Sequence, residues 1–99
     1  MSDAIDIIAT IRTRPEDAAE VTEMLAVYGR RCREMEGTDR FEVYVDRDDP
    51  TTIVVLERYR DQAAVDLHSA DPANAELNEA LERLAIGGGS ELQWLVPRP

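Results

Sequence analysis

The sequence contains little of what cross-linked or metal-bound folds require. Its 99 residues include one cysteine, Cys32, and one histidine, His68. A single thiol can form neither an internal disulfide nor a multi-thiolate metal site, which excludes a disulfide scaffold and a zinc ribbon. One cysteine and one histidine far apart in sequence also give no spaced set of metal ligands. We therefore expect no catalytic metal.

Positive charge is also scarce. Lysine and arginine together number 11 against 21 aspartate and glutamate residues, so the formal net charge is -10. Such a surface repels phosphate backbones and anionic lipid headgroups, so neither nucleic acid nor a membrane is expected as a partner. The acidity is typical of a highly soluble surface, and a cationic partner is the alternative interpretation.

Long apolar runs and a targeting signal are missing as well. No apolar stretch approaches the roughly 20 residues of a membrane-spanning helix. Asp3 and Asp6 stand among the first apolar residues with no basic start, unlike a signal peptide, so we expect a cytoplasmic protein. Hydrophobic residues at 43% allow apolar burial to offset chain entropy, which predicts one folded domain over residues 1–99.

Hydrophobic periodicity predicts alternating strands and helices. Apolar residues at every second position indicate strands at 5–11, 41–45 and 92–96. A continuous apolar run indicates a strand at 53–56 that is buried on both faces. Apolar spacing of three and four indicates helices from about 15 to 36, at 63–69 and at 72–85.

Residues at the expected helix ends have the chemistry of caps. Thr13 and Glu16 are spaced as a capping box, in which each side chain satisfies a free backbone N–H of the first turn. Asp61 can cap the helix at 63–69 with its carboxylate. Gly37 can adopt the left-handed conformation that ends the first helix.

This order of elements is typical of an α+β ferredoxin-like subunit, with a four-stranded antiparallel sheet and helices on one face. The other face has no helix to cover it, although the strand at 53–56 is apolar on both sides and Ile8 and Leu95 add to it. An apolar patch of that size favours pairing with a second copy. We expect a homodimer in which two sheets pack face to face, with Tyr44, Glu42 and Trp94 at the contact.

The segment from Val55 to His68 resembles a known family. It combines a Glu-x-aromatic strand end, a short alanine-rich helix and a histidine, after an acidic turn that contains Pro50. These features resemble the antibiotic biosynthesis monooxygenase family of dimeric α+β barrels. The resemblance implies a homodimer whose subunits each hold a cavity between sheet and helices. Some members use that cavity to oxidise phenolic or quinol substrates with dioxygen and no cofactor.

Other members of the family degrade heme, resemble isomerases or have no known activity. Two departures make the heme interpretation weak. Tyr59 stands where a tryptophan is commoner, and residues 73–78 read Ala-Asn-Ala-Glu-Leu-Asn where heme-degrading relatives carry a histidine.

His68 and Tyr59 are the candidate catalytic residues. A neutral imidazole at His68 could take a proton from a phenol or quinol, which would give the electron-rich anion that reacts with dioxygen. Alternatively, His68 caps carbonyls at the end of its own helix. The Tyr59 hydroxyl could bind a substrate oxygen, although a tyrosine at a strand end is also a common packing residue.

Glu57 and Tyr28 are the candidate substrate-binding residues. Glu57 lies two residues before Tyr59, so both project from one face of the strand. Its carboxylate could orient the imidazole, or pair with Arg58 or Arg60 instead. Tyr28 lies on the apolar stripe of the first helix, where it could reach the cavity or simply pack in the core.

Two functions remain open on this basis. The first is a cofactor-independent monooxygenase that oxidises a phenolic, quinol or polyketide-like aromatic substrate with dioxygen. The alternative is a non-catalytic dimeric module that binds a hydrophobic small molecule. The position of His68 relative to a cavity distinguishes them, because an oxygenase needs a base beside the reacting oxygen and a binder needs only shape.

Overall fold

The computed structural model describes residues 3–99, as four strands and three α-helices with two short 3-10 turns. The elements follow in the order β1 (Ile5–Arg12), η1 (Pro15–Asp17), α1 (Ala18–Arg33), β2 (Thr38–Val45), β3 (Thr52–Tyr59), α2 (Gln62–Ala70), α3 (Pro72–Leu84), η2 (Ile86–Gly88) and β4 (Glu91–Leu95). Within this described part of the chain, no helix has the length and apolar character needed to cross a bilayer.

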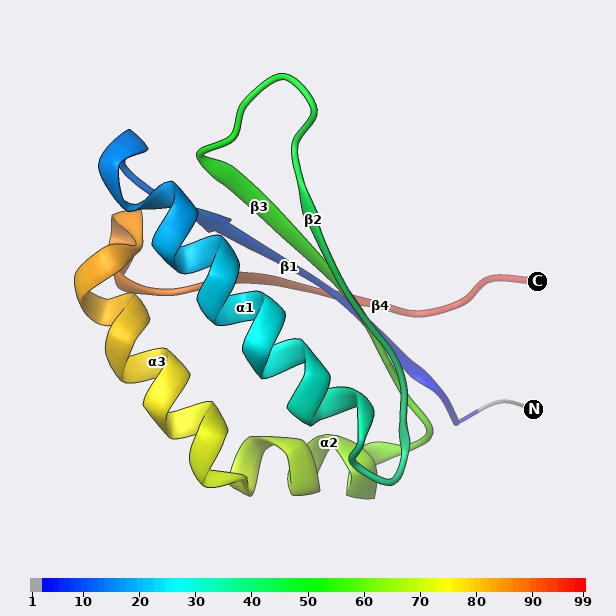
Figure 1. Ribbon diagram of the computed structural model, residues 1–99. Helices are drawn as coiled ribbons and strands as arrows, with labels where there is room; N and C mark the ends of the chain where they lie inside the picture. The colour runs from blue at the N-terminus through cyan, green and yellow to red at the C-terminus, as the bar shows by residue number, and fades with distance from the viewer. Residues whose placement is uncertain (1–2) are drawn as a thin grey trace.

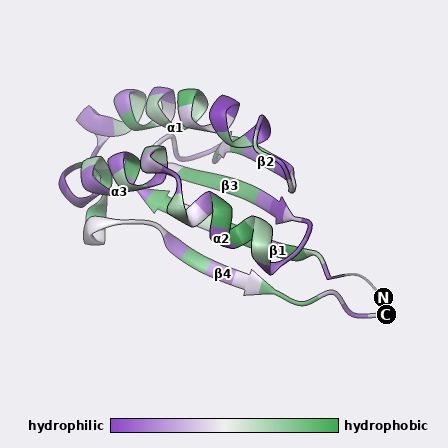
Figure 2. Cartoon of the chain, turned by 90° about the horizontal axis from the view of Figure 1, so that it is seen from below, coloured by the Kyte–Doolittle hydropathy of each residue, from purple (hydrophilic) through white to green (hydrophobic). Residues whose placement is uncertain are grey.

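The four strands form one antiparallel sheet in the order β2-β3-β1-β4. β1 is central, since Ile7 pairs with Glu57 of β3 on one side and with Trp94 of β4 on the other. All three α-helices lie on the same face of the sheet (Figures 1 and 2). The expected ferredoxin-like α+β fold is therefore confirmed.

Strand alternation and helix periodicity together build the core between the two layers. Alternate residues of β1 and β3 point to the helices and are at most 5% exposed: Ile7, Ala9, Ile11, Ile53, Val55 and Tyr59. The apolar stripe of α1, which comprises Val21, Leu25, Tyr28 and Cys32, packs in one cluster with Ala9, Ile11, Ile53 and Val55. Ile7 and Tyr59 pack in a second cluster with Ala64 and Val65 of α2. Leu81 of α3 completes the main cluster and has no exposed surface. Burial of a side chain of this kind stabilises the fold by about 1.5–3 kcal/mol.

The cap expected at Asp61 is confirmed, and the one expected at Thr13 is wrong. The Asp61 carboxylate accepts from the Ala64 backbone N–H at 2.9 Å. Thr13 instead continues the strand region, because its N–H donates to the Thr51 carbonyl at 2.9 Å and it forms a bridge to Ala85. Its hydroxyl donates to the Arg14 carbonyl, and the N-cap of the next turn is Arg14, which makes no side-chain cap hydrogen bond.

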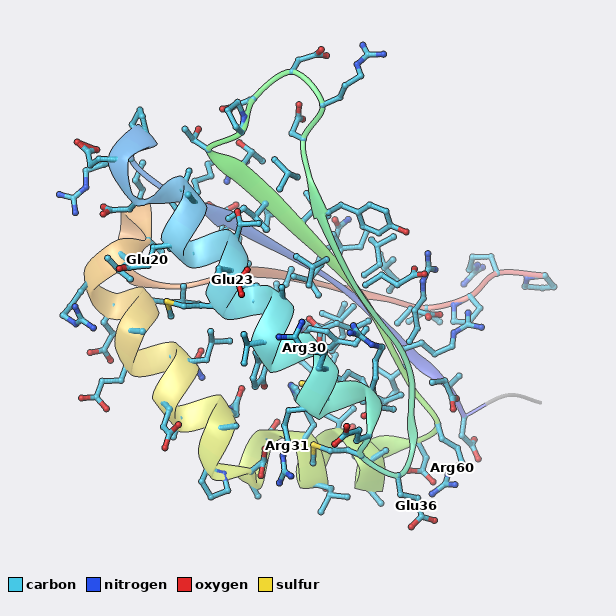
Figure 3. The ribbon with its side chains drawn as sticks, in the orientation of Figure 1. Glu20, Glu23, Arg30, Arg31, Glu36 and Arg60 are labelled. Atoms are coloured by element: carbon cyan, nitrogen blue, oxygen red, sulfur yellow. The ribbon has the colours of Figure 1, made fainter. Side chains whose placement is uncertain are left out.

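Gly37 adopts the left-handed conformation expected after the first helix, with φ of +87°. Its carbonyl accepts from the Arg60 N–H at 2.7 Å, which joins the end of the α1 segment to the end of β3. The side chains of Glu36 and Arg60 pair beside this link at 3.6 Å (Figure 3). The turn therefore fixes where α2 begins.

The opposite face of the sheet is not covered by any helix of residues 3–99 (Figure 2). Its centre is half-buried and largely apolar, with Ile8 opposite Leu56 and Thr10 opposite Val54. Tyr44, at 48% exposure, and Leu95, at 37%, extend it toward the two edges. Trp94 does not belong to this face, contrary to expectation. It pairs with Ile7 and thus points to the helix side.

We expect Gly37→Ala to lower the free energy of unfolding by about 2 kcal/mol or more. The left-handed backbone alone costs a non-glycine residue about 1–2 kcal/mol, and the added Cβ would lie 2.6 Å from the Ala64 Cβ. Gly88→Ala is the matched control, because Gly88 has φ of +83° but no atom within 4 Å of a Cβ. Urea unfolding measures both. Equal losses in the two variants would contradict a role for the Ala64 contact.

Candidate functional site

A cavity of about 370 Å³ lies between the sheet and the helices. This volume is within the range of small-molecule sites. Its walls are mostly apolar, with side chains such as Ile7, Phe41, Val55, Val65, Leu77 and Leu92. Its polar residues include Tyr28, Glu57, Tyr59, His68 and Asn74, together with Ser69, Asn78, Glu82 and Ser90. The walls include no arginine or lysine among the described residues.

His68 lies in the last turn of α2 with its ring against three aromatic side chains. The ring centroid is 5.1 Å from that of Tyr59, 5.9 Å from Tyr28 and 6.1 Å from Phe41. Burial holds the pKa of His68 below its usual value, and the nearby Asp71 carboxylate only partly opposes this. The imidazole is therefore neutral near pH 7.

A hydrogen-bonded chain engages both nitrogens of this imidazole. The Tyr28 hydroxyl donates to Asn74 Oδ1 at 3.0 Å and lies 3.3 Å from His68 Nε2. Because the hydroxyl has a single hydrogen, Nε2–H must donate to Tyr28, which leaves Nδ1 as an acceptor. Nδ1 lies 3.8 Å from Cys32 Sγ. Burial raises the pKa of the Cys32 thiol to about 12, so this group supplies a proton and not a charge.

Glu57 and Tyr59 form a second polar pair in the same wall. The Tyr59 hydroxyl donates to Glu57 Oε1 at 2.5 Å. Burial raises the pKa of the Glu57 carboxyl above its usual value, against the opposing effect of this hydrogen bond. Burial also raises the pKa of Tyr59, and the Glu57 charge adds to that shift. The pair therefore places the Glu57 carboxyl group beside a phenol that keeps its proton.

An ion pair fixes the corner between α2 and α3 that carries this site. Arg31 on α1 donates through two nitrogens to the Asp71 carboxylate, at 2.9 and 3.2 Å. These hydrogen bonds hold the pKa of Asp71 below its usual range. Arg31 reaches down from the end of α1 to this corner (Figure 3). The positions of His68 before the corner and Asn74 after it therefore depend on α1.

The family comparison identifies the kind of protein that carries this cavity. The family model described as antibiotic biosynthesis monooxygenase matches residues 4–80, which include Tyr28, Glu57, Tyr59, His68 and Asn74 of the wall. The chain belongs to this family. No curated protein sequence matches it.

Solved structures show that the whole fold is shared with other proteins. PA3566 from Pseudomonas aeruginosa superposes with a TM-score of 0.90 at 23% identity, covering 100% of this chain and 98% of that chain. Rv0793 from Mycobacterium tuberculosis gives 0.88 at 22% identity, with 97% and 96% covered. SnoaB, a cofactor-independent oxygenase from Streptomyces nogalater, gives 0.83 at 19% identity, with 99% and 96% covered. At these identities the likeness concerns the fold.

The four site residues expected from the sequence meet in this antibiotic biosynthesis monooxygenase domain. His68, Tyr59, Tyr28 and Glu57 all line one cavity, although they come from α1, β3 and α2. The His68 ring contacts Tyr28 and Cys32 side chains, so helix capping by its ring is not what the structure has. The expected pairing of Glu57 with a neighbouring arginine is also wrong. Arg58 pairs with Asp6 on the opposite face, and Arg60 with Glu36 and Asp61.

Three further residues of the site were not predicted from the sequence. Asn74 looks like an ordinary polar position on α3, yet it accepts the Tyr28 hydrogen bond. Leu92 and Trp94 form the β4 side of the cavity and remain 53% and 54% exposed. The strand alternation of β4 contained the signal for both, but the pairing of β4 with β1 was needed to choose the face.

We expect His68→Gln to remove part of the pH dependence of stability. Because the folded pKa of His68 lies below its usual 6.5, the unfolded chain gains a proton first as pH falls. The stability from neutral His68 is therefore complete above about pH 6.5 and is lost as pH falls toward the folded pKa. Urea unfolding from about pH 7 to about pH 5 should show a smaller loss in the variant.

The carboxylates with lowered pKa values, such as Asp6 and Asp71, titrate below this window and should affect both proteins alike. Parallel stability curves for wild type and His68→Gln would contradict the assignment of a neutral, buried imidazole.

Proposed function

We propose that this protein is a cofactor-independent monooxygenase that oxidises a phenolic, quinol or polyketide-like aromatic compound with dioxygen. The observation that carries the proposal is the single apolar cavity wall that holds His68, Tyr59, Tyr28 and Glu57 together. Membership in the family and the fold shared with SnoaB, a cofactor-independent oxygenase, add support.

The reaction balances without any other oxidant. A hydroxyarene that loses its O–H proton becomes an electron-rich anion, which can transfer an electron to dioxygen and then form a C–O bond with it. Loss of water from the resulting hydroperoxide, together with the proton on the same carbon, gives a quinone. One oxygen atom enters the product and the other leaves as water, so the substrate loses the four electrons that dioxygen gains.

The wall offers the groups that this sequence of events needs. An apolar cavity excludes water from a reactive anion and its hydroperoxide. His68, Tyr59 and Glu57 would border the reacting oxygen, and Tyr28 would hold the ring of the substrate in position. Of these groups, His68 and Glu57 can accept a proton near neutral pH.

Oxygen uptake tests this function. Wild type should consume oxygen with at least one compound of a panel of naphthols, anthrones and naphthoquinols, and mass spectrometry should find one added oxygen atom. Leu92→Trp should lower kcat/KM by about tenfold or more by narrowing the cavity. Ile86→Trp is the matched control, since Ile86 is 60% exposed and does not line the cavity.

The alternative function, a non-catalytic module that binds a hydrophobic compound, has one specific observation in its favour. Both nitrogens of His68 already have partners within the protein. Saturable binding of the same aromatics without oxygen uptake above the uncatalysed rate would contradict the oxygenase and favour this second function.

We also propose that two copies pair through the uncovered sheet face. Val54 and Leu56 of β3 lie at its centre, where water would otherwise contact a largely apolar surface. The helix layer already occupies the other face, so only this one is free for pairing.

The dimer proposal predicts that Val54→Arg dissociates the protein. A charged guanidinium at the centre of the contact would lose water without gaining a partner. Light scattering should give the mass of two chains for wild type and of one chain for the variant. Glu79→Arg, on an exposed position of α3, should keep the wild-type mass. A wild-type protein that is monomeric at micromolar concentration would overturn the proposal.

A further inference from the structure

Glu57 is a half-buried carboxyl in an apolar cavity without any cation beside it. Its two neighbours across the sheet are Ile7 and Phe41, which carry no charge. The arginines next to it in sequence point elsewhere, as their ion pairs with Asp6 and Glu36 demonstrate. Its single polar contact among the described residues is the hydroxyl of Tyr59. A carboxylate has four lone-pair sites, so it retains acceptor capacity toward the cavity.

His68 is less available than its position suggests. Nε2 donates to Tyr28, and Nδ1 faces the Cys32 thiol. For His68 to take a proton from a substrate, one of these contacts would have to break first. Glu57 needs no such rearrangement, because it lines the cavity and the hydrogen bond from Tyr59 engages only its Oε1.

We propose that Glu57, held by Tyr59, takes the hydroxyl proton of the bound aromatic, and that His68 is a neutral part of the wall. The proposal rests on the proposed function for its catalytic consequence. In the resting complex Glu57 accepts a hydrogen bond from the substrate hydroxyl. During the reaction the O–H bond breaks, the electron pair stays on the substrate oxygen, and Glu57 becomes a carboxylic acid. It returns the proton to the peroxide oxygen once the C–O bond to dioxygen has formed.

The groups that face Glu57 carry no charge near pH 7. Tyr59 on β3, Tyr28 and Cys32 on α1 all have pKa values raised by burial and remain protonated. His68 on α2 has a lowered pKa and remains neutral. The residues that face it from β1 and β2, Ile7 and Phe41, do not titrate.

This charge arrangement also defines the substrate class. A cavity lined by the carboxyl groups of Glu57 and Glu82, with no arginine or lysine among the described residues, repels an aromatic that carries a carboxylate, sulfonate or phosphate. An uncharged hydroxyarene, in contrast, supplies the donor that the Glu57 carboxylate lacks. The site should therefore select neutral phenols, naphthols and quinols over their anionic derivatives.

The decisive test compares two ligands that differ in one hydrogen-bond donor. Binding of 2-naphthol and of 2-methoxynaphthalene is measured under anaerobic conditions, so that turnover plays no part. Wild type should bind the naphthol about tenfold more tightly or better, which is the effect of a hydrogen bond to a charged group. Glu57→Gln should lose most of this preference, because its amide is a weaker acceptor. His68→Gln should keep it.

Further variants distinguish the role of the Glu57 carboxylate from that of Tyr59 and from a general effect of removing a negative charge. Glu57→Asp should recover part of the preference, and Tyr59→Phe should weaken it while the carboxylate remains. Glu79→Gln, the same change at an exposed position of α3, should bind both ligands as wild type does. Melting curves of all variants exclude unfolding as the cause.

Each outcome decides the proposal. A preference that disappears with His68→Gln but persists in Glu57→Gln would assign the proton to His68 and overturn it. The absence of a preference in wild type, or the absence of binding, would overturn it equally. With an active substrate, Glu57→Gln should lower kcat by about a hundredfold or more and His68→Gln by much less. If the ligand preference follows Glu57 but no compound is oxidised, the proposed function fails and the recognition of a neutral hydroxyl by Glu57 stands.

Discussion

Removal from water governs the chemistry of the cavity wall. Burial is the largest cause of the pKa shift at Tyr28, Cys32, Glu57, Tyr59 and His68. Burial disfavours the charged form of every group, so phenols and thiol keep their protons and the imidazole loses its proton. The phenols, thiol and imidazole around Glu57 are thus uncharged near pH 7, and the Glu57 carboxyl lines the same cavity.

The alternation of β3 supplies this wall and the free sheet face from a single segment. Ile53, Val55, Glu57 and Tyr59 point to the helices, while Val54, Leu56 and Arg58 point away. A carboxyl and a phenol two residues apart therefore share one side and can bond directly. The same geometry sends Arg58 to Asp6 on the far side and keeps its charge out of the cavity. A shift of register by one residue would exchange the site and the outer face.

Most of this fold can be predicted from the sequence, because the apolar residues recur at regular spacing and capping residues or glycines mark the ends of several elements. The alternation at 5–11, the cap at Asp61 and the turn at Gly37 each follow from local chemistry, and each is present in the structure. The capping box at Thr13 failed because a tertiary pairing with Thr51 competes for the same backbone. The side on which Trp94 lies depends on its partner Ile7, which no local pattern specifies.

Several residues of the candidate site could be predicted from the sequence, but the hydrogen bonds between them could not. Residue types and the family resemblance pointed to His68, Tyr59, Tyr28 and Glu57, and these residues share one cavity. Which of them bond to which could not be predicted, because the bonds join elements far apart in the chain. Tyr28 and Asn74 are 46 residues apart and Cys32 and His68 are 36 apart. Because those contacts engage the imidazole of His68, we consider the carboxyl of Glu57 the better candidate for the base.

Stability and activity oppose one another at Glu57. Its folded pKa is raised, so its protonated form favours folding, and this contribution disappears as pH rises through the folded pKa. In its ionised form this carboxyl destabilises the fold, with a hydrogen bond from Tyr59 as compensation. An amide or an apolar side chain would fit this wall at lower cost. The presence of an acid at this position is thus better explained by a ligand that donates a proton than by packing, since packing alone favours its replacement.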